Sequence, residues 1–581
     1  MSQKLSDSRL ANFGANLIYD AFESYQSEFK QITRRAKMRF ESCDWHGGQA
    51  DAEERLDLYS KILNPVVEEI HSSFGGRIHN KLVWASMKAV FSGIITHHND
   101  RELAETFFNS VTRRIFTTVG VDQQIEFVDS DFESPPEQSG QPIYRTFQGG
   151  SKIASIIKSI LSSYKFSSEY EDMNRDIQAI GLILENHLSK IGALRIVEHA
   201  EMVKSVFYRG KGAYLVGRMF SGSHIFPFVL ALLNTPSGVK VDAVILTEAE
   251  VSILFSYTRS YFHVDIERRY DLITFLKFVM PRKRIAELYI AIGHHKHGKT
   301  ELYRDLLHHM ASSEDKFEIA QGIKGMVMTV FTLPGYDLVF KLIRDRFSYP
   351  KTGTRQEVML KYRLVFKHDR AGRLVDAQEF EHLKFERNRF DEALLRELQE
   401  NASQTVLIEN ESVIIRHTYL ERRIIPLDIY IQHSTSAAAE TAVIDYGNAI
   451  KDLVKTNIFP GDMMLKNFGV TRNGRVIFYD YDELCLLTQC SFREFPLPRN
   501  EEDELANEPW FTIGENDIFP SEFKKFLELH GDLKRLFHDH HADLFEVAYW
   551  QNMQQRIENG EIIDILPYKE KNRLHHQYKE N

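Results

Sequence analysis

Three polar residues in the last quarter of the sequence have types and a spacing suited to phosphate chemistry. Asp462 is followed five residues later by Asn467, and Asp480 follows thirteen residues after Asn467. A carboxylate can accept a proton from a hydroxyl group, and carboxylate and amide oxygens can hold a divalent cation beside phosphate oxygens. The order of these residues predicts a phosphoryl-transfer site that uses Mg²⁺ or Mn²⁺.

The same order occurs in protein kinases, where the first aspartate accepts the proton of the substrate hydroxyl group and the other two residues bind metal ions. We expect these roles for Asp462, Asn467 and Asp480. Asn473 and Gly474 lie between them and indicate a type I′ hairpin, which would bring the ends of two strands together. A single aspartate is more often a loop or cap residue, so the prediction depends on the whole set.

Two glycines and a lysine upstream could complete a nucleotide site. Gly322 and Gly325 lie between strand-like segments and would let backbone N–H groups approach phosphates, although an ordinary hairpin turn is the alternative. Lys341 lies in an apolar run, where an ammonium group needs an acidic partner and phosphates to offset its burial. The alternative is an edge-strand lysine that reaches solvent.

The segment SVIIRHTYLERRIIPLDIYI, residues 412–431, is typical of a strand that leads into a hinge between two lobes. Backbone groups near Tyr419, Leu420 and Glu421 could hold adenine there, and Asp428 could meet a ribose hydroxyl group. A charged turn on a solvated face is the alternative.

The elements that must position these residues follow from the apolar pattern. Helical spacing dominates from Leu10 to about Phe127 and from Leu272 to Met310, and β-branched and aromatic runs predict a few strands between Ser205 and His263. From Phe317 the order becomes strand, glycine turn, strand and helix, then more strands and a mostly helical remainder. We expect an α+β fold: a mainly helical N-terminal domain with a few strands, a boundary within residues 311–320, and a bilobal, protein-kinase-like domain.

Composition narrows the class of protein. A chain of 581 residues can hold several domains, and its net charge of −10 lacks the basic excess of a general nucleic-acid binder. The three cysteines, Cys43, Cys485 and Cys490, are few and odd in number, which favours a reducing cytoplasm. We find no signal peptide and no apolar stretch near the roughly 20 residues that span a bilayer, so we expect no membrane association.

Several longer segments carry a resemblance to a known family. In the second half they are AQGIKGMVM, FTLPGYDLVFKLIRDRF, HDRAGRLVDAQEF, NIFPGDMMLKNFGVTRNGRVIFYDYDE and DELANEPWF, and in the first half ETFFNSV, LVGRMF, TRSYF and AELYIAIGHHKHGKTELYRDL. Together they resemble the bacterial isocitrate dehydrogenase kinase/phosphatase family over nearly the whole chain. The resemblance implies an enzyme that phosphorylates a serine of isocitrate dehydrogenase with ATP and removes the same phosphate, which directs carbon between the citric acid cycle and the glyoxylate bypass.

The resemblance also implies residue roles and partners. A regulatory domain would cover residues 1–315, and a catalytic domain with substrate-recognition additions would cover residues 316–581. The implied ligands are ATP and ADP, with AMP and other metabolites as effectors and a homodimer as one assembly. The nucleotide would be bound by Lys341 and by a loop of Ala320, Gln321, Gly322, Ile323, Lys324, Gly325 and Met326. The implied catalytic aspartates are Asp376 and Asp462, and the implied metal ligands are Asn467 and Asp480.

Two departures from ordinary kinases stand out. Pro460-Gly461 replaces the His-Arg that precedes the catalytic aspartate, and Asp480-Tyr481-Asp482 replaces Asp-Phe-Gly. We hypothesise that Asp482 positions or activates water for phosphoserine hydrolysis. For Asp376 we consider pairing with Lys341 or orienting a water molecule at the metal, with Glu357 as another partner for the lysine.

Two other functions remain open. One is a kinase-like scaffold that binds nucleotide and regulates a partner without phosphoryl transfer, which the intact set of Lys341, Asp462, Asn467 and Asp480 disfavours. The other is a phosphotransferase for a small metabolite, because a fold alone does not choose the substrate. The large N-terminal domain disfavours the second.

Overall fold

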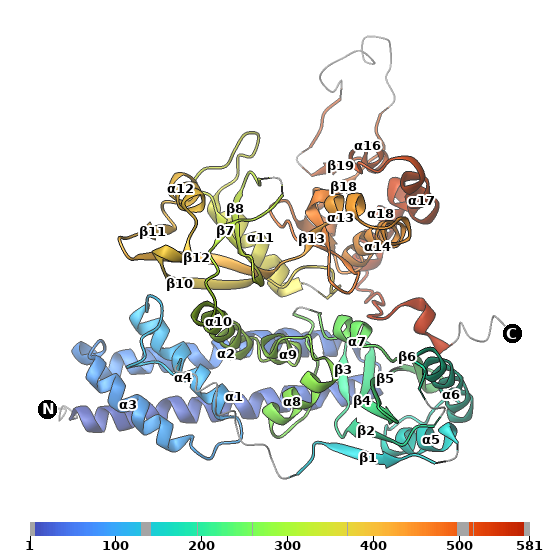
Figure 1. The fold of residues 1–581 in the computed structure, drawn as a ribbon, viewed down its shortest axis with the longest axis horizontal. Coiled ribbons are helices and arrows are strands. Elements are labelled where there is room, and N and C mark those ends of the chain that lie inside the picture. The colour runs from blue at the N-terminus through green and yellow to red at the C-terminus, as the bar shows by residue number, and fades with distance from the viewer. Residues whose placement is uncertain are drawn as a thin grey trace.

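The computed structural model describes residues 6–128, 141–150, 152–193, 196–257, 259–322, 324–368, 370–496, 511–514 and 516–574. Helices α1 to α10 and their sheet form an N-terminal half, in the lower part of Figure 1, and most elements from β7 onward form a C-terminal half above it. None of the helices in these ranges is both long and apolar enough to cross a membrane.

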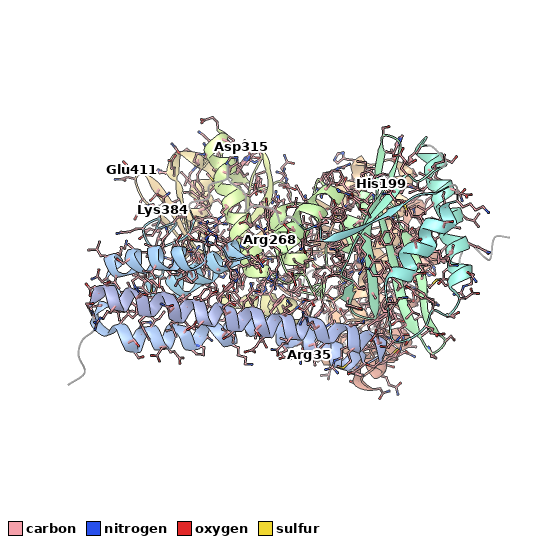
Figure 2. All side chains as sticks on the ribbon, turned by 90° about the horizontal axis from the view of Figure 1, so that it is seen from below. Arg35, His199, Arg268, Asp315, Lys384 and Glu411 are labelled. Carbon is pink, nitrogen blue, oxygen red and sulfur yellow. The ribbon has the colours of Figure 1, made fainter. Side chains whose placement is uncertain are left out.

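Long amphipathic helices open the chain, as the apolar spacing predicts: α1 (Asp7–Glu41), α2 (Trp45–Phe74), α3 (Lys81–Ile94) and α4 (Arg101–Phe116). The Ser6 side chain caps α1 by accepting a hydrogen bond from the Arg9 N–H. Buried residues of α1 then recur every three or four positions, as in Ile18, Phe22 and Tyr25. Seen from below, α1 and α2 run side by side along the molecule (Figure 2).

The N-terminal half also contains an antiparallel sheet in the order β1-β2-β4-β5-β6, with β3 paired to β4. Because side chains alternate along a strand, Leu215 and Met219 of β4 face the helices α5 and α6, whereas Tyr214 and Val216 face the core that includes α1. The sheet therefore lies between two helical layers. Its strands are β1 (Tyr144–Gln148), β2 (His199–Val203), β3 (Phe207–Arg209), β4 (Gly212–Ser221), β5 (His224–Thr235) and β6 (Gly238–Ile245). The remaining helices are α5 (Ile153–Ser163), α6 (Met173–Lys190), α7 (Glu248–Leu254), α8 (Arg269–Val279), α9 (Ile285–Ala291) and α10 (His295–Ser312).

The C-terminal half begins with a second antiparallel sheet in the order β10-β12-β9-β8-β7, with β11 paired to β12. Stacked rings of Phe331 and Phe340, 4.9 Å apart, lie in its core. The elements of this first lobe are β7 (Glu318–Ile319), β8 (Met328–Leu333), β9 (Tyr336–Ile343), α11 (Arg355–His368), β10 (Gln378–Glu386), α12 (Glu392–Asn401), β11 (Val406–Ile408) and β12 (Ser412–Arg422).

The second lobe is mainly helical and packs around buried residues such as Tyr446 and Trp550. Its helices are α13 (Leu427–His433), α14 (Ser436–Val454), α16 (Phe523–Phe526), α17 (Gly531–His541) and α18 (Val547–Glu558), with the short 3₁₀ turns η3 (Leu465–Asn467) and η4 (Leu487–Gln489). Its short strands are β13 (Ile425–Pro426), β14 (Ile458–Phe459), β15 (Phe468–Val470), β16 (Val476–Phe478), β17 (Cys485–Leu486), β18 (Ser491–Phe492) and β19 (Asp517–Ile518). The two lobes agree with the expected α+β, kinase-like arrangement.

Strands β15 and β16 form the predicted hairpin, with Phe468 opposite Phe478, but the predicted turn type is wrong. A type I′ turn needs positive φ at two consecutive residues, and Gly474 has φ +73° while Asn473 does not have positive φ. Instead, the Gly474 N–H donates to the Thr471 carbonyl at 2.9 Å, which closes a three-residue loop with glycine at its left-handed position. The hairpin still brings Asn467 and Asp480 to neighbouring strand ends.

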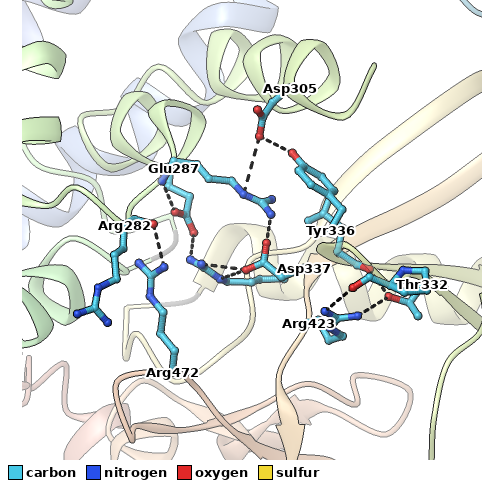
Figure 3. Close-up of polar contacts among 12 residues, drawn as sticks. Arg282, Glu287, Asp305, Thr332, Tyr336, Asp337, Arg423 and Arg472 are labelled. Atoms are coloured by element: carbon cyan, nitrogen blue, oxygen red, sulfur yellow. Dashed lines mark hydrogen bonds and ion pairs between the residues drawn. The ribbon is translucent and has the colours of Figure 1, made fainter. Parts of the chain in front are cut away.

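An ionic network joins the two halves beside β9 (Figure 3). Asp337 of β9 pairs with Arg284, which precedes α9, and lies 3.0 Å from Arg422 of β12. Arg422 also lies 2.6 Å from Glu287 of α9. Although burial raises the pKa of Glu287, the nearby cations Lys283 and Arg422 lower it to about 2, so this carboxylate stays charged. The network connects the C-terminal sheet to the N-terminal half.

The last described segment of the chain contacts the N-terminal half. Arg573 pairs with the buried Asp242 of β6 at 3.0 Å, and the Tyr568 hydroxyl donates to the same carboxylate at 2.7 Å. Leu574 joins the core beneath that sheet. The last described residues therefore bind the N-terminal half.

Candidate active site

The predicted ATP loop, residues 320–326, connects β7 to β8 at the edge of the C-terminal sheet. The Ala320 N–H donates to the Val330 carbonyl at 3.1 Å, and the Ser348 N–H donates to the Met326 carbonyl at 3.1 Å. Both ends of the loop are thus anchored, and the residues between them bridge two strands as the sequence pattern predicts.

Within this loop, Gly322 has φ +120°, a conformation that residues with a side chain rarely adopt. A Cβ atom at Gly322 would meet nothing within 4 Å, and one at Gly325 would meet only backbone of Met328, so the space next to both glycines is open. Lys324 turns to Glu397 of α12, 2.7 Å away. Gln321 lies in the loop, and Ile323 lies outside the described residues.

Lys341 has a buried acidic partner, and that partner is Glu421. The Lys341 Nζ lies 2.7 Å from a Glu421 carboxylate oxygen, with side chains 9% and 3% exposed. Both residues come from adjacent strands, because Tyr419 of β12 opposes Lys341 of β9. Lys341 also donates to the Tyr479 carbonyl at 2.7 Å, which fixes the ammonium group next to Asp480.

The two sequence-based partners for Lys341, Asp376 and Glu357, are therefore wrong. Glu357 instead closes a capping box at the start of α11, where its carboxylate accepts from the Thr354 N–H at 2.7 Å. Helix α11 does contribute to the buried pair, but through Tyr362, whose hydroxyl donates to Glu421 at 3.4 Å. Burial raises the pKa of Glu421, and Lys341 and this hydroxyl oppose the rise.

Asp462 and Asn467 occupy one compact loop between β14 and β15. The Met464 N–H donates to a carboxylate oxygen of Asp462 at 3.0 Å, and the Asn467 amide donates to the Asp462 carbonyl at 3.2 Å. Gly461 makes the loop possible, because it has φ +78° and a Cβ there would lie 2.6 Å from the Glu483 carbonyl oxygen. Asp462 and Asn467 are thus brought together as the spacing predicts.

Asp480 and Asp482 follow β16 as two neighbouring carboxylates. Burial raises the pKa of Asp480 to about 7, and the charge of Asp482 adds to this rise. Lys351, from the segment between β9 and α11, lies 2.9 Å from Asp482 and also pairs with Glu483. The sequence offered no sign of Lys351 as a partner, because more than a hundred positions separate it from Asp482.

Asp376 follows a parallel bridge between the segment before β10 and the end of β16. Leu374 pairs with Phe478, so Asp376 and Asp480 each stand two residues beyond the paired positions. The Gln378 amide donates to Asp376 at 2.7 Å, and Arg259 of the N-terminal half lies 3.9 Å away. Burial raises the pKa of Asp376, and Arg259 opposes the rise.

The expected hinge lies where β12 leads to α13. Tyr419 and Leu420 are paired within the sheet on both sides, with β9 and β10, whereas Glu421 pairs with β9. Asp428 lies in the first turn of α13, and its Oδ1 atom is buried without a hydrogen-bond partner among the described residues. A ribose hydroxyl group would satisfy this oxygen.

The donor set of Asn467, Asp480 and Asp482 suits a divalent cation held jointly with a nucleotide. In the described ranges, no group of three or more His, Cys, Asp and Glu side chains forms a closed metal site. Mg²⁺ usually takes one or two carboxylates and completes its shell with phosphate oxygens and water. The buried carboxylate of Asp480 fits such a cation, whose charge would offset the burial and the repulsion from Asp482 that raise the pKa of Asp480.

Comparisons with known proteins match both halves of the chain to one family. Residues 15–314 match the family model "Isocitrate dehydrogenase kinase/phosphatase (AceK), regulatory domain", and residues 315–570 match the corresponding kinase domain, which implies the use of ATP. The isocitrate dehydrogenase kinase/phosphatase of Anaeromyxobacter sp. (strain Fw109-5) is 49% identical over 98% of this chain and 99% of its own. That of Anaeromyxobacter dehalogenans (strain 2CP-C) is 46% identical over 98% and 99%.

Among solved structures, the Cydia pomonella granulovirus kinase PK-1 covers 46% of this chain and 99% of its own, with 13% identity and a TM-score of 0.20. That score supports no statement about the fold. The two domain models together span most of the sequence, and relatives close to half identical align over nearly its full length. This chain therefore belongs to the isocitrate dehydrogenase kinase/phosphatase family.

Proposed function

We propose that this chain transfers a phosphoryl group from ATP to a serine of isocitrate dehydrogenase, and that the same cleft hydrolyses the phosphoserine. The observation that carries the proposal is the position of Lys341, whose Nζ contacts both Glu421 and the carbonyl that precedes Asp480. This arrangement supports a phosphate site between the two lobes. Residues 1–315 would then regulate the reactions and residues 316–581 would catalyse them.

Nucleotide binding would use elements of both lobes. Backbone N–H groups of Gly322 and Gly325 would face the phosphates, because neither residue has a side chain to fill the open space there. Lys341 would pair with phosphate oxygens while Glu421 holds its ammonium group in place. Asp428 would accept a hydrogen bond from the ribose with its unpartnered Oδ1.

In the kinase reaction, Asp462 would orient the serine hydroxyl group and accept its proton as the oxygen attacks the γ-phosphorus. Its carboxylate is held in place by the Met464 N–H, which leaves one oxygen for the substrate. Asn467 and Asp480 would hold Mg²⁺ or Mn²⁺, which when bound offsets the charge of the phosphate oxygens.

In the phosphatase reaction, we assign Asp482 to position and activate the attacking water. Lys351, 2.9 Å from Asp482, would hold this carboxylate in position. Asp376, which follows the bridge between Leu374 and Phe478, would help to orient the same water. Asp482→Ala should lower phosphatase activity much more than kinase activity, and equal losses in the two assays would contradict this role. Asp539→Ala, an aspartate on the exposed face of α17, serves as the matched control.

For effectors such as AMP, we assign the cavity of about 380 Å³ between α4, α10 and β10. It is lined by cationic residues, including Arg113, Lys296 and Lys299, and by aromatic rings such as Phe380. Burial lowers the pKa of Lys299 to about 7, so a bound phosphate would favour its charged form. Lys299→Met should abolish AMP binding measured by calorimetry, whereas Lys277→Met on α8 should not.

One experiment tests the main proposal. The purified chain is incubated with isocitrate dehydrogenase, Mg²⁺ and ATP labelled at the γ-phosphate, and ADP or AMP is added after labelling. Serine label that appears and is then released as phosphate supports both activities. If this chain binds nucleotide but does not label the dehydrogenase, the result supports the scaffold function. Label on a small metabolite would support the alternative phosphotransferase function. Sedimentation of the same sample would test the expected homodimer.

A further inference from the structure

Cys485 and Cys490 lie close enough to react with each other. Their Sγ atoms are 3.5 Å apart, and both side chains are half-buried rather than sealed in the core. A disulfide needs a sulfur–sulfur distance of about 2.05 Å, so a movement of roughly 1.5 Å would close the bond. The third cysteine, Cys43, is exposed on the N-terminal half and has no part in this pair.

The backbone between the two thiols is already closed into a turn. The 3₁₀ turn η4 separates them, and the Cys490 N–H donates to the Leu487 carbonyl at 3.1 Å. The Gln554 side chain of α18 donates to the carbonyls of Leu487 and Cys490, each at 2.8 Å. These bonds keep the sulfur atoms facing one another, which lowers the entropy lost when they join.

The pair is also coupled to the catalytic segments. Cys485 opposes Phe459 in the ribbon that β14 and β17 form. Phe459 lies three residues before Asp462, and Cys485 lies three residues after Asp482. Gly461 is tightly packed against this ribbon, because a Cβ there would lie 2.6 Å from the Glu483 carbonyl oxygen. A shift of Cys485 would therefore move the supports of both aspartates.

The two thiols differ in acidity in a way that suits sequential attack. The hydrogen bond from Cys490 and the charge of Lys361 lower the pKa of Cys485. The same hydrogen bond raises the pKa of Cys490. Cys485 is thus the better attacking group, and Cys490 can resolve the mixed disulfide that results.

We propose that Cys485 and Cys490 are a redox-active dithiol that low-molecular-weight disulfides convert to an intramolecular disulfide, which slows phosphoryl transfer. The Cys485 thiolate attacks one sulfur of glutathione disulfide and releases one glutathione. The Cys490 thiolate then attacks the Cys485 sulfur and releases the second. The protein loses two electrons and two thiol protons, and the oxidant is reduced to two glutathione molecules. Dithiothreitol reverses the reaction.

The test uses the full chain with Cys43→Ser, equilibrated in glutathione buffers of increasing disulfide fraction, acid-quenched and alkylated. Cleavage after Arg475 and Arg493 puts both cysteines on one peptide, residues 476–493. We expect this peptide to appear without alkyl groups and two hydrogen masses lighter than the reduced form. Cys490→Ser should never give this species.

Activity of the same samples completes the test. We expect the disulfide form to lose about tenfold or more in kcat/KM for dehydrogenase phosphorylation, because misplacement by about 1 Å has effects of this size. Dithiothreitol should restore the rate, and Cys485→Ser, which lacks the attacking thiol, should resist the oxidant. Full alkylation of both thiols at every disulfide fraction overturns the proposal, and a disulfide with an unchanged rate overturns its coupling to the site. The coupling rests on the proposed function, and an inactive reduced enzyme would count against that function while leaving the disulfide measurement valid.

Discussion

Glu421→Gln should destabilise the C-terminal half and impair ATP use. Glu421 and Lys341 form an ion pair at 2.7 Å with side chains 3% and 9% exposed, and removal of one partner of a buried pair costs about 3–5 kcal/mol. In the variant, Lys341 keeps the Tyr479 carbonyl at 2.7 Å and the Tyr479 ring at 5.0 Å. We therefore expect the lower end, about 3 kcal/mol, which corresponds to a decrease in Tm of about 6–12 °C for a domain of this size.

The assay is thermal unfolding followed by calorimetry, together with the kinase rate at varied ATP concentration. We expect kcat/KM for ATP to fall at least tenfold, because Lys341 loses the group that orients it. Glu379→Gln is the matched control: Glu379 lies on the neighbouring strand, pairs with His417 at 2.9 Å and is 36% exposed. Such a pair contributes about 1 kcal/mol or less, so this variant should melt within about 3 °C of the natural chain.

A double variant distinguishes the effect of the buried charge on stability from the effect of side-chain packing. Replacing both partners, as Lys341→Met with Glu421→Leu, leaves no buried charge and should recover much of the lost Tm while the enzyme stays inactive. If Glu421→Gln has the same Tm as the natural chain and the same kcat/KM for ATP, the proposed role of this ion pair is refuted.

Three further predictions follow from other sites. Asp462→Asn should lower kcat for phosphorylation by about 10²–10⁴ while calorimetry finds ATP binding unchanged, and a kcat within tenfold of the natural enzyme would contradict its role as general base. Burial and the charge of Asp100 raise the pKa of Glu102 to about 8, above its value in the unfolded chain, so the stability supplied by its protonated form is lost as the pH rises from about 4 to about 8. Glu102→Gln avoids this loss, and its Tm advantage should grow between about pH 5 and about pH 8. Arg422→Ala removes pairs to both Glu287 and Asp337 and should cost about 1–2 kcal/mol, measured as a Tm decrease that high salt diminishes.

Short stretches of the sequence suffice to predict much of the candidate site. Asp462, Asn467 and Asp480 lie within one loop and one hairpin, so turn and strand signals between neighbours suffice to bring them together. The helices of the first half and the strands around Lys341 were likewise predicted from apolar spacing, since that spacing reflects the face that each element buries. Even the error in the hairpin turn left the strand ends in place, because both loop types reverse the chain.

The partners of the charged residues required the tertiary structure. Lys341 meets Glu421 because β9 and β12 are neighbours in the sheet, and strand order is not a property of either strand alone. Asp482 meets Lys351 because the fold brings two loops together, across a separation in sequence that local signals do not span. The sequence by itself thus determined the family, the two-part plan and the order of the candidate site residues. The fold decided which charges are paired and buried, because pairing depends on register and proximity between segments far apart in the chain.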